Sequence, residues 1–257
     1  MSKSADDAAE ETFFGHLVEL RTRIMRALLA VTIAFLALLP FAQELYGAFA
    51  LPLLSKLPAG GQIIAIDVAS PFFAPIKLAF VLALMIAMPV VLYQMWAFVA
   101  PGLYRREQYL AKPLLVSATF LFYLGCAFAW FLVLPLVFTF LTAVTPGGVA
   151  MMTDINRYLD FVLLIFLAFG VCFEIPVAVV ILAAMGWVDV PQLKESRSYV
   201  IVGIFVVAAI VTPPDVISQV LLAVPMVLLY EIGIIAARAV VRQREAKEAK
   251  EAELGEP

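Results

Sequence analysis

Long uninterrupted runs of apolar residues constrain this chain more than any other feature of its sequence. Six such runs cover residues 24–41, 72–99, 113–140, 158–184, 199–211 and 216–235. About 20 apolar residues are enough for a helix to cross the hydrocarbon core of a bilayer, where a helix satisfies its own backbone polar groups. Hydrophobic residues make up 64% of the chain and charged residues 14%, and a soluble protein of this size could not bury so much apolar surface. The sequence therefore predicts an all-α polytopic membrane protein with six transmembrane helices, and it excludes a soluble enzyme, a disordered protein and a nucleic-acid-binding protein.

The distribution of lysine and arginine predicts the orientation of these helices. If consecutive helices alternate in direction, all 17 basic residues except Lys56, Lys77 and Arg157 lie on the side of the two termini. Short cytoplasmic loops carry this excess of positive charge. We therefore expect both termini in the cytoplasm, with a cytoplasmic segment 1–23, a six-helix membrane domain 24–235 and a charged cytoplasmic tail 236–257. The acidic N-terminus does not begin like a secretory signal peptide.

The runs differ in length, and this difference carries architectural information. At 1.5 Å per residue the second and third runs reach about 42 Å, beyond a hydrocarbon core of about 30 Å, so these helices must tilt, bend or protrude. The fifth run reaches only about 20 Å, and two prolines in the following TPPD turn stop it. We expect the last two helices to form a short hairpin, recessed from the outer surface, in a concave wall. Residues 43–70 are expected to form a structured cap on the membrane surface.

Residues typical of enzyme sites are scarce. His16 is the one histidine and lies outside the apolar runs, whereas Cys126 and Cys172 lie inside them. No His or Cys has metal-ligand spacing, and no glycine-rich phosphate-binding motif occurs. We therefore expect no catalytic residue, no metal, no cofactor, no built-in nucleotide motor and no nucleic-acid partner.

Polar residues within the apolar runs are the first functional candidates. Glu174 lies near the middle of the fourth run, where a charge costs about 2.5–3.5 kcal/mol on insertion scales. It is expected to face a wet cavity or a partner, and a structural hydrogen bond between helices is the alternative. Asp215 is placed to cap the sixth helix, and Gln219 lies four residues later on the same face. Lys77, near the outer end of the second helix, is expected to snorkel.

Two carboxylates on the terminal side are weaker candidates by spacing alone. Glu19 precedes Arg23 by four residues, in the favourable order for an ion pair along one helix. Glu107 directly follows two arginines and is expected to be solvated. Spacing by itself favours structural roles for both.

Five motifs, in order along the chain, resemble those of the TatC family, the multispanning core of the twin-arginine protein translocase. They are HLVELRTR (16–23), DVASPFFAPIK (67–77), FVAPGLYRRE (98–107), FGVCFEIP (169–176) and TPPDVISQ (212–219). The resemblance extends over residues 16–238 and implies six helices in the bacterial cytoplasmic (inner) membrane. Five co-linear motifs are far more specific than any one of them.

The resemblance implies a cytoplasmic site for signal peptides with paired arginines. Glu19 and Glu107 match the family's acidic residues at that site, and Arg21 and Phe98 lie in the same two motifs. A carboxylate suits this ligand, because it accepts a bidentate bond from a planar guanidinium that lysine cannot reproduce.

The resemblance also implies partners and an energy source. The expected assembly is a hetero-oligomer with several copies, containing single-span subunits of the TatA and TatB types within the lipid bilayer. Glu174, Asp215 and Gln219 are the candidate contacts with those subunits. Folded cargo would cross by the proton-motive force, without enzymatic activity. Two alternatives stay open: a proton-coupled secondary transporter with Glu174 as its relay, and a membrane scaffold that transports nothing.

Overall fold

The computed structural model describes residues 3–54, 62–99, 111–146, 152–211 and 216–254, which are almost entirely helical. The helices are α1 (Lys3–Leu38), α2 (Ala42–Leu54), α3 (Ser70–Val99), α4 (Ala111–Phe128), α5 (Leu134–Val144), α6 (Ile155–Cys172), α7 (Ile175–Ala184), α8 (Val190–Glu195), α9 (Arg197–Val211) and α10 (Val216–Leu254). A 3-10 turn η1 (Leu39–Phe41) joins α1 to α2, and a π-helical segment η4 (Ala129–Val133) joins α4 to α5.

Five helical stretches are long and apolar enough to cross a membrane, and a sixth is apolar but shorter. The five are Leu17–Ala50, Ser70–Phe98, Lys112–Val144, Ile155–Ala184 and Gln219–Gln243, and the shorter one is Arg197–Ile210. They follow the six predicted runs in order, so the all-α polytopic membrane architecture is confirmed. The fifth helix is the short one, as predicted.

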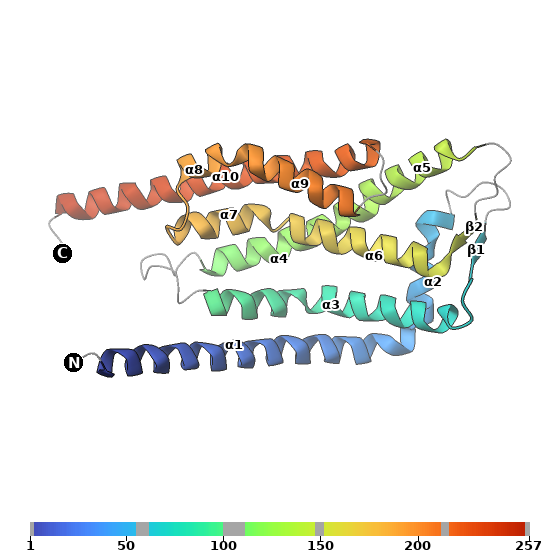
Figure 1. Ribbon diagram of the computed structural model, residues 1–257, viewed down its shortest axis with the longest axis horizontal. Coiled ribbons are helices and arrows are strands. Elements are labelled where there is room, and N and C mark those ends of the chain that lie inside the picture. The colour runs from blue at the N-terminus through green and yellow to red at the C-terminus, as the bar shows by residue number, and fades with distance from the viewer. Residues whose placement is uncertain (1–2, 55–61, 100–110, 147–151, 212–215, 255–257) are drawn as a thin grey trace.

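The helices lie roughly side by side along the long axis of the molecule (Figure 1). Both chain termini lie at one end, which we call the terminal end, whereas α2 and two short strands lie at the opposite, distal end. Helix α1 packs along α3, α4 packs on α6, and α10 packs on α7 and α9. The N-terminal helices thus form one side of the bundle and α7 to α10 form the other.

Two glycines allow α4 and α6 to approach closely at the centre of the bundle. A methyl group added at Gly125 would lie 2.6 Å from the carbonyl oxygen of Phe169, and one added at Gly170 would lie 2.6 Å from a ring carbon of Phe122. Phe122 and Phe169 are almost fully buried. Any larger residue at either glycine would push the two helices apart, so this contact determines how they face each other.

The chain leaves helical geometry within two of the spans. The fourth span breaks at Phe173 and Glu174, between α6 and α7. Pro176 explains this break, because its ring clashes with the preceding turn and its nitrogen donates no hydrogen bond. In the third span the π-helical segment ends at Val133, and α5 begins directly after it with Leu134 and Pro135 in its first turn.

The first and last helices continue beyond their apolar runs. Helix α1 begins at Lys3, and α10 runs without interruption to Leu254, across the domain boundaries expected at 23 and 235. Helix α9 ends and α10 begins short of the level that α5 reaches at the distal end (Figure 1), as expected of a recessed hairpin. The TPPD turn itself lies outside the described residues.

The distal end contains α2, which belongs to the segment 43–70 expected to form a cap, and one element that the all-α prediction omitted; the position of this segment on a membrane surface stays a prediction. Within the cap, α2 packs through the ring of Phe49 against Trp130 and Phe166, at centroid distances of 5.0 and 5.7 Å. Strand β1 (Gln62–Ile64) pairs in parallel with β2 (Met152–Asp154). Three-residue strands are too short to show an alternating pattern, and their pairing joins distant parts of the chain, so the sequence did not indicate them.

Candidate functional site

The predicted acidic site on α1 is built around Glu19. Arg23 Nε donates to Glu19 Oε1 at 2.9 Å, and a terminal guanidinium nitrogen of Arg23 contacts the same oxygen. The ion pair predicted from the four-residue spacing is therefore confirmed. The Glu19 side chain is 35% exposed and that of Arg23 20% exposed, so the carboxylate is accessible at the terminal end of α1. Glu107 lies outside the described residues, and its proximity to Glu19 stays a prediction.

A groove between α1 and α3 begins beside this ion pair. It encloses about 180 Å³ and is lined by Leu20, Arg23, Ile24, Ala27, Val91, Gln94, Met95 and Phe98. The predicted residue Phe98 therefore lines the same groove as the partner of Glu19. Apart from Arg23 and Gln94, the described residues that line this groove are apolar, and its volume suits one or two apolar side chains next to a charged one.

Gln94 is the residue of this groove that sequence analysis missed. It is only 9% exposed, and its Oε1 is buried with no hydrogen-bond partner among the described residues. A buried unpaired polar group of this kind costs about 1–3 kcal/mol. The sequence did hold a signal, because Gln94 is the single amide side chain in the run 72–99. A donor from a bound molecule could satisfy this acceptor only if the Gln94 side chain turned towards the groove.

Arg21 lies on a different face of α1. It lines a separate hollow of about 380 Å³, together with Val18, Thr22, Met25, Arg26 and Leu29. The structure thus does not bring Arg21 together with Phe98. Two residues apart on a helix, Arg21 and Arg23 point about 200° apart around the axis, which explains the separation.

Glu174 occupies the break between α6 and α7. Its backbone N–H donates to the carbonyl of Val171 at 3.0 Å, and its own carbonyl accepts from the N–H of Ala178 at 2.9 Å. The residue is half-buried, and its Oε1 is buried without a hydrogen-bond partner among the described residues. The structure therefore places an unpaired carboxyl oxygen in the middle of a span, at a point where the helix is interrupted.

The two other predicted partner contacts differ in what the structure shows. Asp215 lies outside the described residues. Gln219 Nε2 donates to the carbonyl oxygen of Phe205 at 3.0 Å and so links α10 to α9. This bond gives Gln219 a role within the chain, and contact with a partner stays a prediction.

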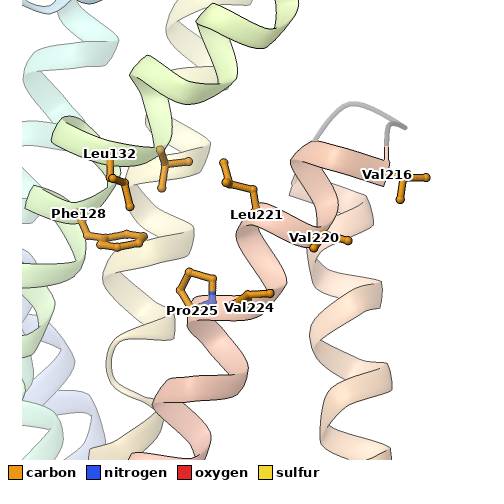
Figure 2. Close-up of a pocket in the computed structure, with 8 residues that line it drawn as sticks. Phe128, Leu132, Val216, Val220, Leu221, Val224 and Pro225 are labelled. Atoms are coloured by element: carbon orange, nitrogen blue, oxygen red, sulfur yellow. The ribbon is translucent and has the colours of Figure 1, made fainter.

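An apolar hollow lies beside the start of α10. It encloses about 530 Å³ between Phe128, Leu132 and Val133 on one side and five residues of α10 on the other, Val216, Val220, Leu221, Val224 and Pro225. Figure 2 shows Leu221 and Pro225 facing Phe128 and Leu132 across this hollow. The described residues of its lining are all apolar, which is suitable for a lipid chain or an apolar helix.

The distal end contains polar contacts that the sequence did not predict. Lys77 on α3 forms an ion pair with Asp160 on α6, a residue that sequence analysis did not single out. Lys77 therefore has a specific partner and does not merely extend towards water. Nearby, Asn156 Nδ2 donates to Ser70 Oγ at 2.5 Å.

Asp154 caps the start of α6 at the same end. Its carboxylate accepts from the backbone N–H groups of Asn156 and Arg157, both at 3.0 Å, and from that of Ile66 at 3.2 Å. These backbone hydrogen bonds, chiefly those from Arg157 and Ile66, lower the pKa of Asp154 below its usual value. The cap thus ties the segment after β1 to α6.

Comparison with known proteins gives these features a context. Residues 15–225 match the family described as Sec-independent protein translocase protein (TatC). A protein of that name from Azotobacter chroococcum mcd 1 is 54% identical over 245 residues, covering 95% of this chain and 96% of the relative. The protein of that name from Escherichia coli (strain K12) is 52% identical over 223 residues, covering 87% and 86%. A crystal structure described as the twin arginine translocase receptor TatC has a TM-score of 0.77 at 36% identity, covering 88% of this chain and 99% of the other.

Proposed function

Because this chain belongs to the TatC family of Sec-independent protein translocase proteins, we propose that the α1–α3 groove beside Glu19 binds twin-arginine signal peptides. The chain is a multi-pass membrane protein and a core subunit of the twin-arginine translocase. In our proposal it acts as a receptor and not as an enzyme. It lies in the bacterial inner membrane, with the terminal end in the cytoplasm. The excess of basic residues on the terminal side supports this orientation.

The contact between Glu19 and Arg23 is the observation that carries the proposal. It supports the proposal because the Glu19 carboxylate already accepts the guanidinium of Arg23, a residue that lines the groove. A signal arginine would bind the same carboxylate or replace Arg23 on it, and Glu107 is proposed to take the second arginine. One such pair at 4 Å gains about 1 kcal/mol in water and about 4 kcal/mol at an effective dielectric of 20. Charge alone therefore gives modest affinity, and the apolar part of the signal has to add to it.

The groove is proposed to hold the residues that follow the arginines. An apolar side chain of the signal would pack against Ile24 and Phe98, which line it. A backbone N–H or side-chain donor of the signal would satisfy the buried Oε1 of Gln94 once this side chain turned towards the groove. This order of contacts, charge at the mouth and apolar residues inside, matches a signal in which paired arginines precede an apolar stretch.

Contacts with single-span subunits of the TatA and TatB types are proposed for the other side of the bundle. The unpaired Oε1 of Glu174 and the apolar hollow beside Leu221 and Pro225 support a helix docking there. Asp215 and Gln219 are proposed contacts of the same kind. The resulting hetero-oligomer would move folded proteins by the proton-motive force.

Charge reversal at Glu19 tests the receptor proposal. Glu19→Lys should lower crosslinking of a photoreactive twin-arginine signal peptide by about tenfold, equivalent to about 1.4 kcal/mol. The matched control is Glu195→Lys, an equal change of charge at an exposed residue of α8, away from the groove. Wild-type protein should discriminate against a twin-lysine peptide. Equal crosslinking by the Glu19 and Glu195 variants would refute the site.

Substitution of Glu174 separates the translocase from a proton relay. In our proposal Glu174→Gln retains much of the polar contact, whereas Glu174→Ala loses it and impairs export more. Signal binding at the terminal end should survive both changes. A relay requires a group that titrates, so a Gln variant as inactive as the Ala variant would favour the secondary transporter. Family membership already argues against that alternative and against a scaffold that transports nothing.

A further inference from the structure

We propose that Lys77 and Asp160 form a binding site for the zwitterionic headgroup of a phospholipid, in the leaflet at the distal end. The ligand class is a headgroup with one phosphate and one primary ammonium. Lys77 would bind the phosphate and Asp160 the ammonium. This proposal does not depend on signal binding or on which end is cytoplasmic.

Both side chains of this ion pair can form further hydrogen bonds. Lys77 Nζ contacts Asp160 Oδ1, and the two side chains are 50% and 51% exposed. Neither side chain makes another hydrogen bond or ion pair within the described part of the chain. An ammonium has three donors and a carboxylate about four acceptor sites. Each charge therefore has room for a second partner while the pair stays intact.

The depth of the pair matches the level of lipid headgroups. Helix α3 has 30 residues, or about 45 Å, close to a whole bilayer with its headgroups, whose hydrocarbon core takes about 30 Å. Lys77 lies seven residues after the distal end of α3, Ser70, so it is about 10 Å along the helix. Asp160 lies five residues after the start of α6, about 8 Å along it. Both charges thus lie near the boundary between headgroups and hydrocarbon.

A hollow beside the Lys77–Asp160 ion pair provides an apolar surface on which the rest of a lipid could pack. It encloses about 540 Å³, and its lining includes Phe35 of α1, Phe73 and Phe80 of α3, and Asn156 of α6, besides the ion pair. Phe35 and Phe80 meet edge to face at 5.8 Å, which closes one wall. Phe73 and Phe80 are at least half exposed. The glycerol backbone and upper acyl chains of a lipid could pack on these rings while its headgroup reaches the charges.

Charge complementarity favours a zwitterion over an anionic lipid. A headgroup with only a negative charge would gain from Lys77 but be repelled by Asp160, whose exposure is equal. A zwitterion satisfies both, and a primary ammonium can also donate hydrogen bonds to the carboxylate. The chemistry therefore indicates phosphatidylethanolamine, and not phosphatidylglycerol, as the probe to use.

Native mass spectrometry of the purified protein tests this site. With matched acyl chains, we expect the wild type to retain phosphatidylethanolamine at least fivefold better than phosphatidylglycerol. The variant Lys77→Gln with Asp160→Asn should lose this preference. The matched control is Arg197→Gln with Glu231→Gln, which removes the ion pair between α9 and α10, whose contact is 2.6 Å and whose side chains are 44% and 37% exposed. Equal retention of the two lipids by the wild type, or an unchanged preference in the Lys77 and Asp160 variant, would overturn the proposal.

A second measurement keeps the test decisive if the double variant does not fold. A photoreactive residue replacing Phe73 in otherwise unchanged protein, in membranes that contain the full translocase, should crosslink to phospholipid. Crosslinking mainly to another protein subunit would overturn the lipid assignment and assign the site to a partner helix.

Discussion

The described side-chain contacts near the two ends of α3 differ in how far apart their partners lie along the chain. Beside the groove at the terminal end, Glu19 and Arg23 pair four residues apart on α1. At the distal end, besides the local bonds with which Asp154 caps α6, four side-chain contacts join residues 83 to 109 positions apart. They are Lys77 with Asp160, Asn156 with Ser70, Asp154 with the backbone of Ile66, and the hydroxyl of Tyr158 with the carbonyl of Phe49 at 2.6 Å.

This difference suggests that the two ends of the bundle have different roles. The distal contacts connect α2, α3 and α6, so this end is fixed by bonds between elements. At the terminal end an acceptor on Gln94 lacks a partner among the described residues, and the Glu19 carboxylate is partly exposed. A bound peptide that supplied a donor to Gln94 would remove the cost of an unpaired buried polar group. We infer that these distal contacts contribute to stability and that recognition takes place at the terminal end, where α8, α9 and α10 are joined by their own contacts, Arg197 with Glu231 and the Tyr230 hydroxyl with the Leu193 carbonyl.

Removing distal bonds should have the largest effect on stability. Tyr158→Phe with Asn156→Ala removes the hydrogen bonds to the Phe49 carbonyl and to the buried Ser70 hydroxyl, each worth about 0.5–1.5 kcal/mol. We expect a clearly lower thermal unfolding midpoint in detergent, with signal-peptide affinity within about twofold of wild type once folded. The control Arg23→Gln removes the local bond of Glu19 and should cost less than about 1 kcal/mol. If the Arg23 variant is destabilised as much as the distal one, the proposed difference in roles fails.

Gln94→Leu should separate recognition from stability in the other direction. It removes a buried unpaired oxygen, so the unfolding midpoint should stay the same or rise. It also removes the proposed acceptor for the signal, so affinity for a twin-arginine peptide should fall about fivefold, or by about 1 kcal/mol. Titration of labelled peptide against both proteins measures this effect, with Gln43→Leu, an exposed residue in the first turn of α2, as control. Unchanged affinity would show that the peptide does not reach Gln94.

The smallest effect concerns pH at the distal end. The pKa of Asp154 is lowered in the folded state, so its stabilising contribution is present above its unfolded pKa, about 3.9. That contribution is lost as the pH falls through the lower, folded pKa. Asp154→Asn should therefore be slightly less stable than wild type at pH 7, and the difference should shrink below pH 4. A difference that grows on acidification would mean that the cap bonds are not formed.

Sequence patterns were sufficient where a property depends on one segment alone. Run length in apolar residues determined the spans and the short α9, because a helix must cover a known thickness. The four-residue spacing determined the Glu19–Arg23 pair, because residues four apart share a helix face. Pro176 likewise explains the interruption at Glu174. The motif order identified the family, and with it the role expected of Glu19.

Only the tertiary structure decided which faces of different helices meet. The rotation of each helix about its axis depends on packing, such as the contacts of Gly125 and Gly170 with Phe169 and Phe122. That rotation buries Gln94 in the groove with Phe98 and turns Arg21 away from it. It also brings Lys77 to Asp160, 83 residues along the chain. No period or spacing within one apolar run predicts these contacts between helices, because they depend on how the surfaces of two helices fit together.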